Sequence, residues 1–172
     1  MFETKRLELH EVRLEHKVAF HQGREALGRL LGVTVAEDWP EFPEAFAVPD
    51  RKADADEERG SMLWPGYLFV DRREGALIGN GGYAGEPNVV GEVEVGYEVA
   101  PPYRNRGYAS EAVRALVDQA FQRVGITTVI AHTLAEETAS VRVLRKVGFQ
   151  WDGQLATEEG GAVWRWKLDR GR

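Results

Sequence analysis

The segment Arg104-Asn105-Arg106-Gly107-Tyr108-Ala109 joins a predicted strand to a predicted long helix. Residues 93–99 alternate apolar and other side chains, as a strand does, and Pro101-Pro102 then ends the strand because proline has no N–H for a ladder. From Ala109 to Val124 the apolar residues recur on one helix face. Free N–H groups and the helix dipole at such an N-terminus favour an anion, and Gly107 lets a phosphate approach the backbone.

A solvated basic turn is the alternative interpretation of this segment, and a second segment bears on the choice. Residues 139–147 have the pattern of a short helix that Gly148 closes, with cations in its last turn. Arg-x-x-Gly-x-Ala at 104–109, followed by Ala-Ser-x-Arg-Val-Leu-x-Lys-x-Gly-Phe at 139–149, resembles the GCN5-related N-acetyltransferases (GNAT). The resemblance is strongest to the subgroup that acetylates N-terminal alanines of ribosomal proteins.

The resemblance extends from a first strand at Arg6-Leu7-Glu8-Leu9 to a last strand at Val163-Trp164-Arg165-Trp166. It implies an α/β fold with a mixed, mostly antiparallel sheet of six to seven strands, which is splayed at its central strand and flanked by about four helices. It also implies one domain over residues 1–172 and an N-acetyltransferase that uses acetyl-CoA as its co-substrate.

Composition limits the class of protein. One domain is the default for 172 residues, and the absence of cysteine excludes disulfides, thiolate nucleophiles and cysteine-bound metals. The net charge of −6 argues against a nucleic-acid partner. No apolar run is long enough for a membrane span, and residues 1–6 lack a signal-peptide core. We therefore expect a soluble cytoplasmic protein. No bound metal is expected, since the four histidines show no ligand spacing. Whether the protein forms a homodimer is an open question at this point.

Further elements follow from periodicity. Strands are predicted at 7–12, 67–70, 76–83, 127–133 and 149–156, and a helix at 14–31 with Val18, Leu27, Leu30 and Leu31 toward the core. Gly79-Asn80-Gly81-Gly82 has some likeness to a phosphate loop, but no Gly-Lys-Ser/Thr follows it. A bulge or a close backbone approach within a strand is the better interpretation.

The resemblance assigns the cofactor contacts. The turn formed by Arg104, Asn105, Arg106, Gly107, Tyr108 and Ala109 would hold the pyrophosphate of coenzyme A. In the family, a backbone amide at the splayed central strand binds the thioester carbonyl, and this position corresponds to about Val99. Such a donor stabilises the negative charge that develops on the carbonyl oxygen.

The resemblance places a catalytic glutamate at Glu94, which we expect to act as the general base. Glu92, Glu94 and Glu98 share one strand face, so the residues alone do not separate them, and three solvent-facing side chains are the alternative. A carboxylate is strong enough for an α-amine. Near pH 7.4 an α-amine loses its proton at a cost well under about 1 kcal/mol, against roughly 4 kcal/mol for a lysine amine.

The general acid is less directly indicated. Many relatives use a tyrosine where this chain has Leu144, so Ser140 is the available hydroxyl to meet the departing sulfur. An ordinary helix cap is the alternative role for Ser140. The family's asparagine three residues earlier is Glu137 here, which removes an amide expected to contact the pantetheine arm.

The acceptor is expected to be a cationic amine. Residues 37–58 carry nine acidic and two basic side chains, and the resemblance places this segment beside the acceptor groove. Trp39 is expected mainly to pack in the core, with lining of the acceptor groove as the alternative that the resemblance implies. An acidic wall would attract a basic protein N-terminus, a polyamine or an aminoglycoside, whereas a solvated loop would have no such role. Two other functions stay open at this point: an acyl-CoA-binding module without catalysis, and an interaction domain on the same fold.

Overall fold

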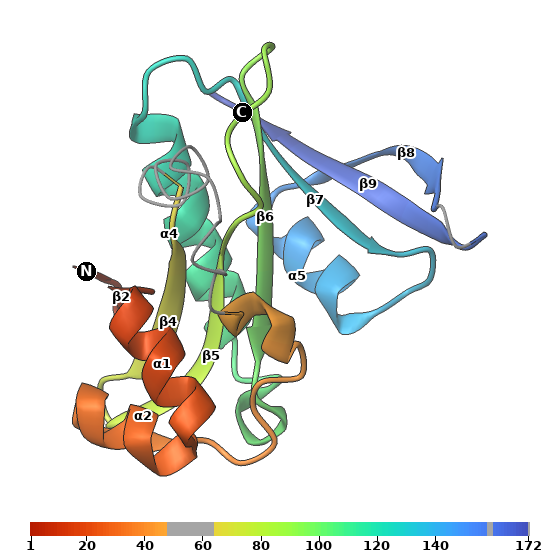
Figure 1. Ribbon diagram of the computed structural model, residues 1–172. Helices are drawn as coiled ribbons and strands as arrows, with labels where there is room; N and C mark the ends of the chain where they lie inside the picture. The colour runs from red at the N-terminus through yellow and green to blue at the C-terminus, as the bar shows by residue number, and fades with distance from the viewer. Residues whose placement is uncertain (48–63, 158–159, 172) are drawn as a thin grey trace.

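A computed structural model describes residues 1–47, 64–157 and 160–171 (Figure 1). Its sheet has nine strands, eight of them in the order β1-β2-β4-β5-β6-β7-β9-β8, while β3 pairs with β5. Only the β3–β5 and β6–β7 pairs are parallel. The strands are β1 (Phe2–Glu3), β2 (Leu7–Glu11), β3 (Thr34–Val35), β4 (Gly66–Asp71), β5 (Ala76–Tyr83), β6 (Glu92–Val99), β7 (Thr128–Leu134), β8 (Gln150–Ala156) and β9 (Ala162–Asp169). The predicted mixed, mostly antiparallel sheet is confirmed, and the two-residue strands β1 and β3 are additional.

Four α-helices lie in the described ranges: α1 (Leu14–Gln22), α2 (Arg24–Leu31), α4 (Tyr108–Gln122) and α5 (Ala139–Val147). Short 3₁₀ helices η1 (Pro43–Phe46) and η2 (Pro101–Tyr103) precede β4 and α4. None of these helices combines the length and the apolarity that a membrane crossing needs.

The prediction of one helix over 14–31 is wrong. Gly23 has φ +118°, outside the helical region, and divides the segment into α1 and α2. The change of direction also alters which side chains face inward. Leu27 is buried and Leu31 packs beside it, but Val18 and Leu30 are 42% and 47% exposed and do not belong to the core.

The two faces of the sheet carry separate apolar clusters. On one face α4 packs its apolar side against the central strands, with Val113 and Leu116 fully buried. On the other face α1, α2 and η1 cover the first half of the sheet, where Leu27 and Phe46 are buried against Leu68. Figure 1 shows α1, α2 and η1 in front of the sheet and α4 behind it.

The sheet opens between β6 and β7. These strands pair only from Glu92–Thr128 to Glu94–Ile130, and β7 then stays with β9 while β6 stays with β5. In Figure 1 the two strands form a V, with α5 beside the opening. The predicted splay at the central strand is thus present.

The direction of the β6 amides follows from its ladder with β5. Ala100 donates its N–H to Ile78 O at 2.8 Å. Because backbone groups alternate in direction along an antiparallel strand, the amides of Tyr97 and Val99 point to the opposite side, toward β7. β7 has diverged at that level, so these two N–H groups face the opening.

The glycines of β5 allow close backbone packing. A Cβ on Gly81 would lie 2.7 Å from Gly96 O, and a Cβ on Gly82 would overlap the backbone of Pro65 and Gly66. The β4–β5 register also shifts beside Phe69, which marks a bulge. The prediction of a bulge or close approach, instead of a phosphate loop, is confirmed.

Candidate active site

The turn at 104–107 leads directly into α4. Asn105 and Gly107 have φ of +60° and +82°, and Gly107 occupies the N-cap position of the helix. The side chain of Tyr108 is buried and donates its O–H to Asp71, so only its backbone faces the turn. The side chains of Arg104, Asn105 and Arg106 are exposed. The helix thus begins where the sequence predicts, with its free amides and two arginines together.

Arg6, which directly precedes β2 and belongs to neither sequence motif, fixes this turn. Its Nη1 donates to Arg106 O at 2.9 Å, and its Nε donates to Glu111 Oε2 at 2.7 Å. Its guanidinium lies 4.3 Å from the centroid of the Tyr108 ring. Burial would raise the pKa of Glu111, but hydrogen bonds from Thr4 and Arg6 lower it, so Glu111 stays a carboxylate. The turn at 104–107 is therefore held in place by Arg6 without the help of a ligand.

The two arginines of the turn already have acidic neighbours. Arg104 donates from Nε to Val99 O at 2.8 Å and from Nη2 to Glu41 Oε2 at 2.6 Å. Arg106 Nη1 lies 3.7 Å from Glu74 Oε1. All of these side chains are more than one third exposed, so solvent weakens both pairs.

The opening between β6 and β7 is a groove of about 420 Å³. Four of the residues predicted for cofactor binding or catalysis line it: Val99, Arg104, Ala109 and Ser140. Leu144 also lines it, whereas Glu94 does not. The structure thus brings the turn, the β6 amides and the start of α5 to one groove.

Ser140 is not the cap of α5. The N-cap is Thr138, whose Oγ1 accepts a hydrogen bond from Val141 N at 3.3 Å. The capping alternative for Ser140 is therefore wrong. The Ser140 carbonyl accepts from Tyr97 O–H at 3.3 Å, which ties α5 to β6 across the groove.

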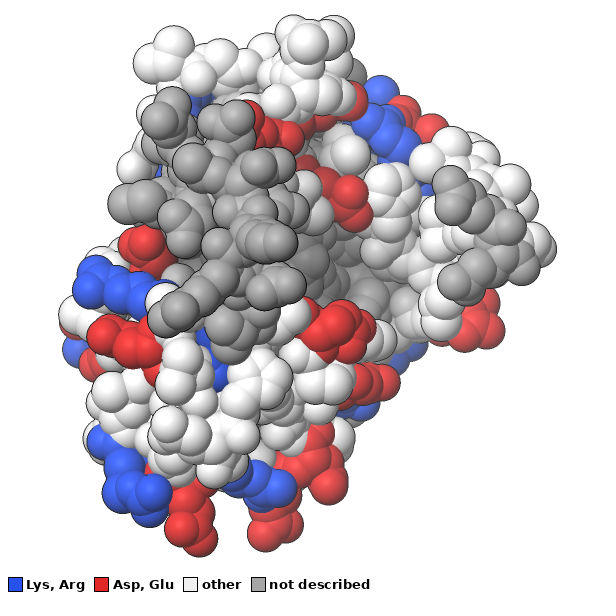
Figure 2. Space-filling view, viewed as in Figure 1, with Lys and Arg blue, Asp and Glu red and all other residues white. Residues whose placement is uncertain are grey.

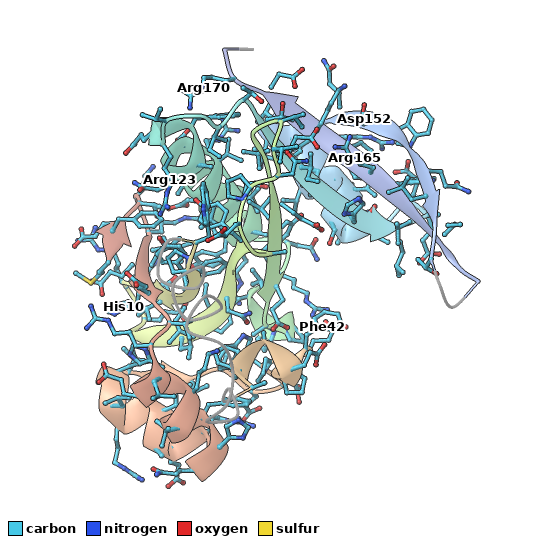
Figure 3. The ribbon with its side chains drawn as sticks, turned by 45° about the horizontal axis from the view of Figure 1, so that its top comes forward. His10, Phe42, Arg123, Asp152, Arg165 and Arg170 are labelled. Atoms are coloured by element: carbon cyan, nitrogen blue, oxygen red, sulfur yellow. The ribbon has the colours of Figure 1, made fainter. Side chains whose placement is uncertain are left out.

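The three glutamates of β6 have different surroundings. Glu92 Oε1 accepts from Arg165 at 2.8 Å, within a charged cluster of β6, β8 and β9 that includes Asp152 (Figure 3). Glu94 Oε1 lies 2.8 Å from His132 Nδ1. Glu98 is only 8% exposed, so the interpretation of three solvent-facing side chains is wrong for this residue.

Glu98 and His132 each carry a buried polar atom without a partner. Glu98 Oε2 accepts the Glu41 N–H at 2.7 Å, but no described residue donates to Oε1. Burial raises the pKa of Glu98, although hydrogen bonds from the Glu41 and Phe42 amides oppose this shift. His132 Nε2 is likewise buried and unpaired within the described residues, and His132 lines the groove. The pairing of His132 with Glu94 depends on how β6 and β7 align, which the periodicity of the two strands does not show.

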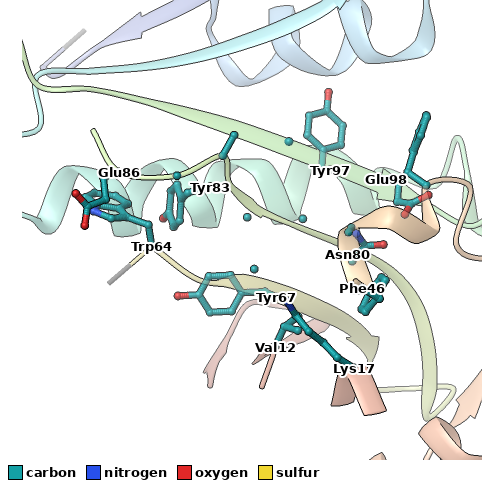
Figure 4. A pocket seen from close by; sticks show the side chains of 18 residues that line it. Val12, Lys17, Phe46, Trp64, Tyr67, Asn80, Tyr83, Glu86, Tyr97 and Glu98 are labelled. Atoms are coloured by element: carbon teal, nitrogen blue, oxygen red, sulfur yellow. The ribbon is translucent and has the colours of Figure 1, made fainter. Parts of the chain in front are cut away.

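A second cavity of about 960 Å³ lies over β4, β5 and β6, beside η1 (Figure 4). It shares Phe42, Gly96, Tyr97 and Glu98 with the groove between β6 and β7, so the two spaces meet on β6. Its charged lining residues include one cation and two carboxylates: Lys17, Glu86 and Glu98.

Trp39 does not line this cavity, and the prediction that it packs in the core is confirmed. It is 6% exposed and packs against Phe46 in the apolar cluster under η1. Its indole N–H donates to Asn80 Oδ1 at 2.8 Å, and Asn80 does line the cavity. Trp39 therefore supports the wall from behind.

Only part of the acidic segment can be placed. Glu37, Asp38, Glu41 and Glu44 belong to the described residues, while the five acidic residues from Asp50 to Glu58 lie outside them. Figure 2 shows acidic and basic side chains interspersed on this face of the molecule.

Glu137, at the position of the family's asparagine, does not line the groove. Its carboxylate forms two hydrogen bonds with Arg145, at 2.7 and 2.8 Å, which lower the pKa of Glu137. Across the described ranges, histidines and carboxylates form no group suited to a metal ion.

Comparisons with known proteins agree with this geometry. The family model described as "Acetyltransferase (GNAT) domain" matches residues 6–150. YjdG of Bacillus subtilis (strain 168), an uncharacterized N-acetyltransferase, is 25% identical over 150 residues, which cover 87% of this chain and 89% of that protein.

Solved structures share the fold at lower identity. The ribosomal-protein-S5-alanine acetyltransferase from Vibrio fischeri superimposes with a TM-score of 0.70 at 18% identity, covering 99% of this chain and 96% of that one. RimL, a ribosomal L7/L12 α-N-protein acetyltransferase solved with coenzyme A, gives 0.66 at 18% identity, with 96% and 95% covered. The family match over most of the chain, on a sheet opened at β6, shows that the protein is an N-acetyltransferase of the GNAT family.

Proposed function

We propose that the protein transfers the acetyl group of acetyl-CoA to a primary amine by direct attack, and that the amine is a protein N-terminus or a small cationic amine. The meeting of the two cavities on β6 is the observation that carries this proposal, since one space suits a cofactor arm and the other an acceptor. Acetyl-CoA supplies an activated thioester, and the chain supplies binding, orientation and proton transfer.

The turn at 104–109 would hold the pyrophosphate of coenzyme A. Arg104 and Arg106 contribute charge, Asn105 and Gly107 give the left-handed backbone, and the amides of Tyr108 and Ala109 begin the helix. Ala109 and Arg104 also line the groove, which places the turn at its entrance.

The N–H of Val99 would receive the developing charge of the thioester carbonyl. Its direction toward the opening supports this role, and the Tyr97 amide points the same way. An amide donor preorganised at a developing oxyanion is worth about 2.7–4 kcal/mol in measured cases.

Glu94 would act as the general base together with His132. The carboxylate does not reach either cavity, but His132 lines the groove and is bonded to Glu94 through Nδ1. The proton of the amine would therefore reach Glu94 through His132 or a water molecule. An α-amine needs little assistance, because its reference pKa is about 7.7–8.0.

Ser140 would donate its hydroxyl hydrogen bond to the departing sulfur. It lines the groove at the first turn of α5, and its hydroxyl is not used for capping. Because Leu144 fills the position of the family's tyrosine, we expect this assistance to be weaker than that of a general acid.

The proposal is tested by incubating the protein with acetyl-CoA and a panel of peptides and amines, with release of free coenzyme A as the measurement. We expect turnover with at least one cationic amine and a strong loss of kcat in Glu94→Gln. Unchanged kcat in Glu94→Gln from pH 6 to 9 would exclude Glu94 as the base. The absence of turnover with every amine would overturn the proposed activity.

A further inference from the structure

Glu98 lies where the groove between β6 and β7, which is proposed to hold the cofactor, meets the second cavity. Its side chain is more than nine-tenths buried, and only one of its two oxygens has a partner among the described residues. A buried carboxylate oxygen without a donor is unfavourable, because it has lost its hydrogen bonds to water. A polar ligand with an N–H group would remove this cost.

The neighbouring position on the same face is open. Gly96 precedes Glu98 by two residues, and a Cβ built on Gly96 would meet no atom within 4 Å. Gly96 lines both spaces, so the passage between them lies above its backbone. Glu98 on one side and Glu94 on the other flank this passage, each about 7 Å along the strand.

We propose that Glu98 is the residue that binds the acceptor: its free Oε1 accepts a hydrogen bond from the amino group of a primary amine that enters above Gly96. This inference rests on the proposed function and adds the acceptor contact to it. The amine arrives as an ammonium ion and donates to Glu98 without transferring its proton there. One proton of the ammonium leaves toward the Glu94–His132 pair before the nitrogen attacks. The new C–N bond then forms as the C–S bond breaks, and the nitrogen loses a second proton while the departing thiolate takes up one.

The contacts around Glu98 fix its carboxylate for this purpose. The Glu41 amide holds Oε2 at 2.7 Å, and Asn80 stands beside Glu98 at the same end of the cavity (Figure 4). Asn80 Oδ1 accepts from the Trp39 indole, so the amide N–H groups of Asn80 are free to donate, and a hydrogen bond from this side chain lowers the pKa of Glu98. Only Oε1 is left for a ligand.

The backbone of Gly96 leaves room for the acceptor at this point, because no side chain is present and no atom lies within 4 Å of a Cβ built there. We therefore expect a primary amine that can lie over this backbone, such as a peptide that begins with a small residue or a linear polyamine. A peptide and a linear polyamine share a terminal primary amino group, so the two are distinguished by comparing them as substrates.

The three glutamates of β6 provide a matched experiment. Glu98→Gln, Glu94→Gln and Glu92→Gln each remove one charge from the same face, and Glu92 lies outside both cavities. The probes are spermidine and a tripeptide amide that begins with alanine. Binding is measured by calorimetry in the presence of coenzyme A, and KM and kcat are measured with acetyl-CoA.

Glu98→Gln should weaken probe binding and raise the acceptor KM at least tenfold, while the Kd for acetyl-CoA stays within twofold. Glu94→Gln should lower kcat instead, and Glu92→Gln should change neither. An acceptor KM and Kd within twofold of wild type in folded Glu98→Gln would overturn the proposal. If that variant does not fold, Glu98→Asp should give the same rise in KM by withdrawing the carboxylate.

The failure of the proposed activity has a different signature. If wild type binds a probe in the presence of coenzyme A but shows no turnover, the proposed acetyl transfer is overturned. The affinity of Glu98→Gln for the probe then still tests whether Glu98 contacts the amine. If neither probe binds to wild type, the acceptor role of Glu98 is overturned. Gly96→Val provides an independent check, since a branched side chain in the passage should lower kcat/KM at least 100-fold. Ala156→Val, at an exposed strand position outside both cavities, should not.

Discussion

Arg104 Nη2 lies 2.6 Å from Glu41 Oε2, and the amide of the same Glu41 holds Glu98. Arg104, which lines the groove between β6 and β7, is thus bonded to the residue that holds Glu98 beside the second cavity. On the proposed function, a phosphate that approaches Arg104 would compete with the Glu41 carboxylate. Cofactor binding and acceptor binding would therefore be coupled through Glu41.

Glu41→Gln should tighten acetyl-CoA binding and raise the acceptor KM. The substitution removes the carboxylate that competes for Arg104, but it also releases the side-chain contact that holds the Glu41 backbone near Glu98. Exposed ion pairs are worth about 0–1 kcal/mol, so the gain in affinity should not exceed about fivefold. Calorimetry at low and high salt measures it. Weaker acetyl-CoA binding in this variant would show that Glu41 assists the cofactor.

Gly107→Ala should weaken acetyl-CoA binding by an order of magnitude or more while the protein stays folded. The φ of +82° disfavours any side chain, at a cost of about 1–2 kcal/mol, and a Cβ there would stand 3.5 Å from Arg6 Nη2 on the surface of the turn. Binding is measured by calorimetry and folding by thermal unfolding. Unchanged affinity in the folded variant would mean that the phosphates do not approach this turn.

Arg6→Lys should raise the KM for acetyl-CoA and leave kcat nearly unchanged. Lysine keeps the charge but loses the planar fork that reaches both Glu111 and the Arg106 carbonyl. The expected loss is about five- to tenfold in Kd, because the turn is no longer fixed before binding. Arg72→Lys, which changes an exposed arginine near the same edge, is the control. An equal effect of both variants would indicate general destabilisation.

The sequence predicts elements whose signals are local. The strand before Pro101, the turn at 104–107 and the C-cap at Gly148, which has φ +115°, all depend on neighbours within a few residues. The division of helix 14–31 at Gly23 was not predicted, because a single glycine within an apolar pattern does not show that its backbone leaves the helical region.

The candidate site depends on contacts between distant segments. Glu41 and Glu98 are 57 residues apart, and Glu94 and His132 are 38 apart. The periodicity of β6 places its three glutamates on one face. It does not indicate that Glu98 is the one held by the Glu41 amide, or that Glu94 is the one beside His132 of β7. The contact of Trp39 with Asn80 is not predicted for the same reason, since it joins segments 41 residues apart.

Asp71→Asn should destabilise the protein at pH 7, and the difference should shrink in acid. Burial would raise the pKa of Asp71, but hydrogen bonds from Tyr108 and from the Glu74 and Arg73 amides lower it below its usual value. A lowered pKa in the folded state stabilises the protein above the unfolded pKa, and this contribution is lost as pH falls through the folded pKa. We expect a loss of about 2 kcal/mol at pH 7, as for hydrogen bonds to a charged group. Urea unfolding from pH 3 to pH 7 measures it, and a constant difference at all pH values would contradict the assignment.

His132→Gln should lower kcat and leave the acetyl-CoA Kd within about threefold. The imidazole connects Glu94 to the groove, so glutamine at this position keeps a polar group but removes the group that can accept and pass on a proton. Positioned acid–base groups contribute about 10²–10⁴-fold, and the double variant with Glu94→Gln should lose little more than the single variants, because the two residues act as a unit. Additive losses would show that Glu94 works through water alone. If His132→Gln keeps full activity from pH 6 to 9, the proton does not pass through His132, and its contact with Glu94 only orients the two strands.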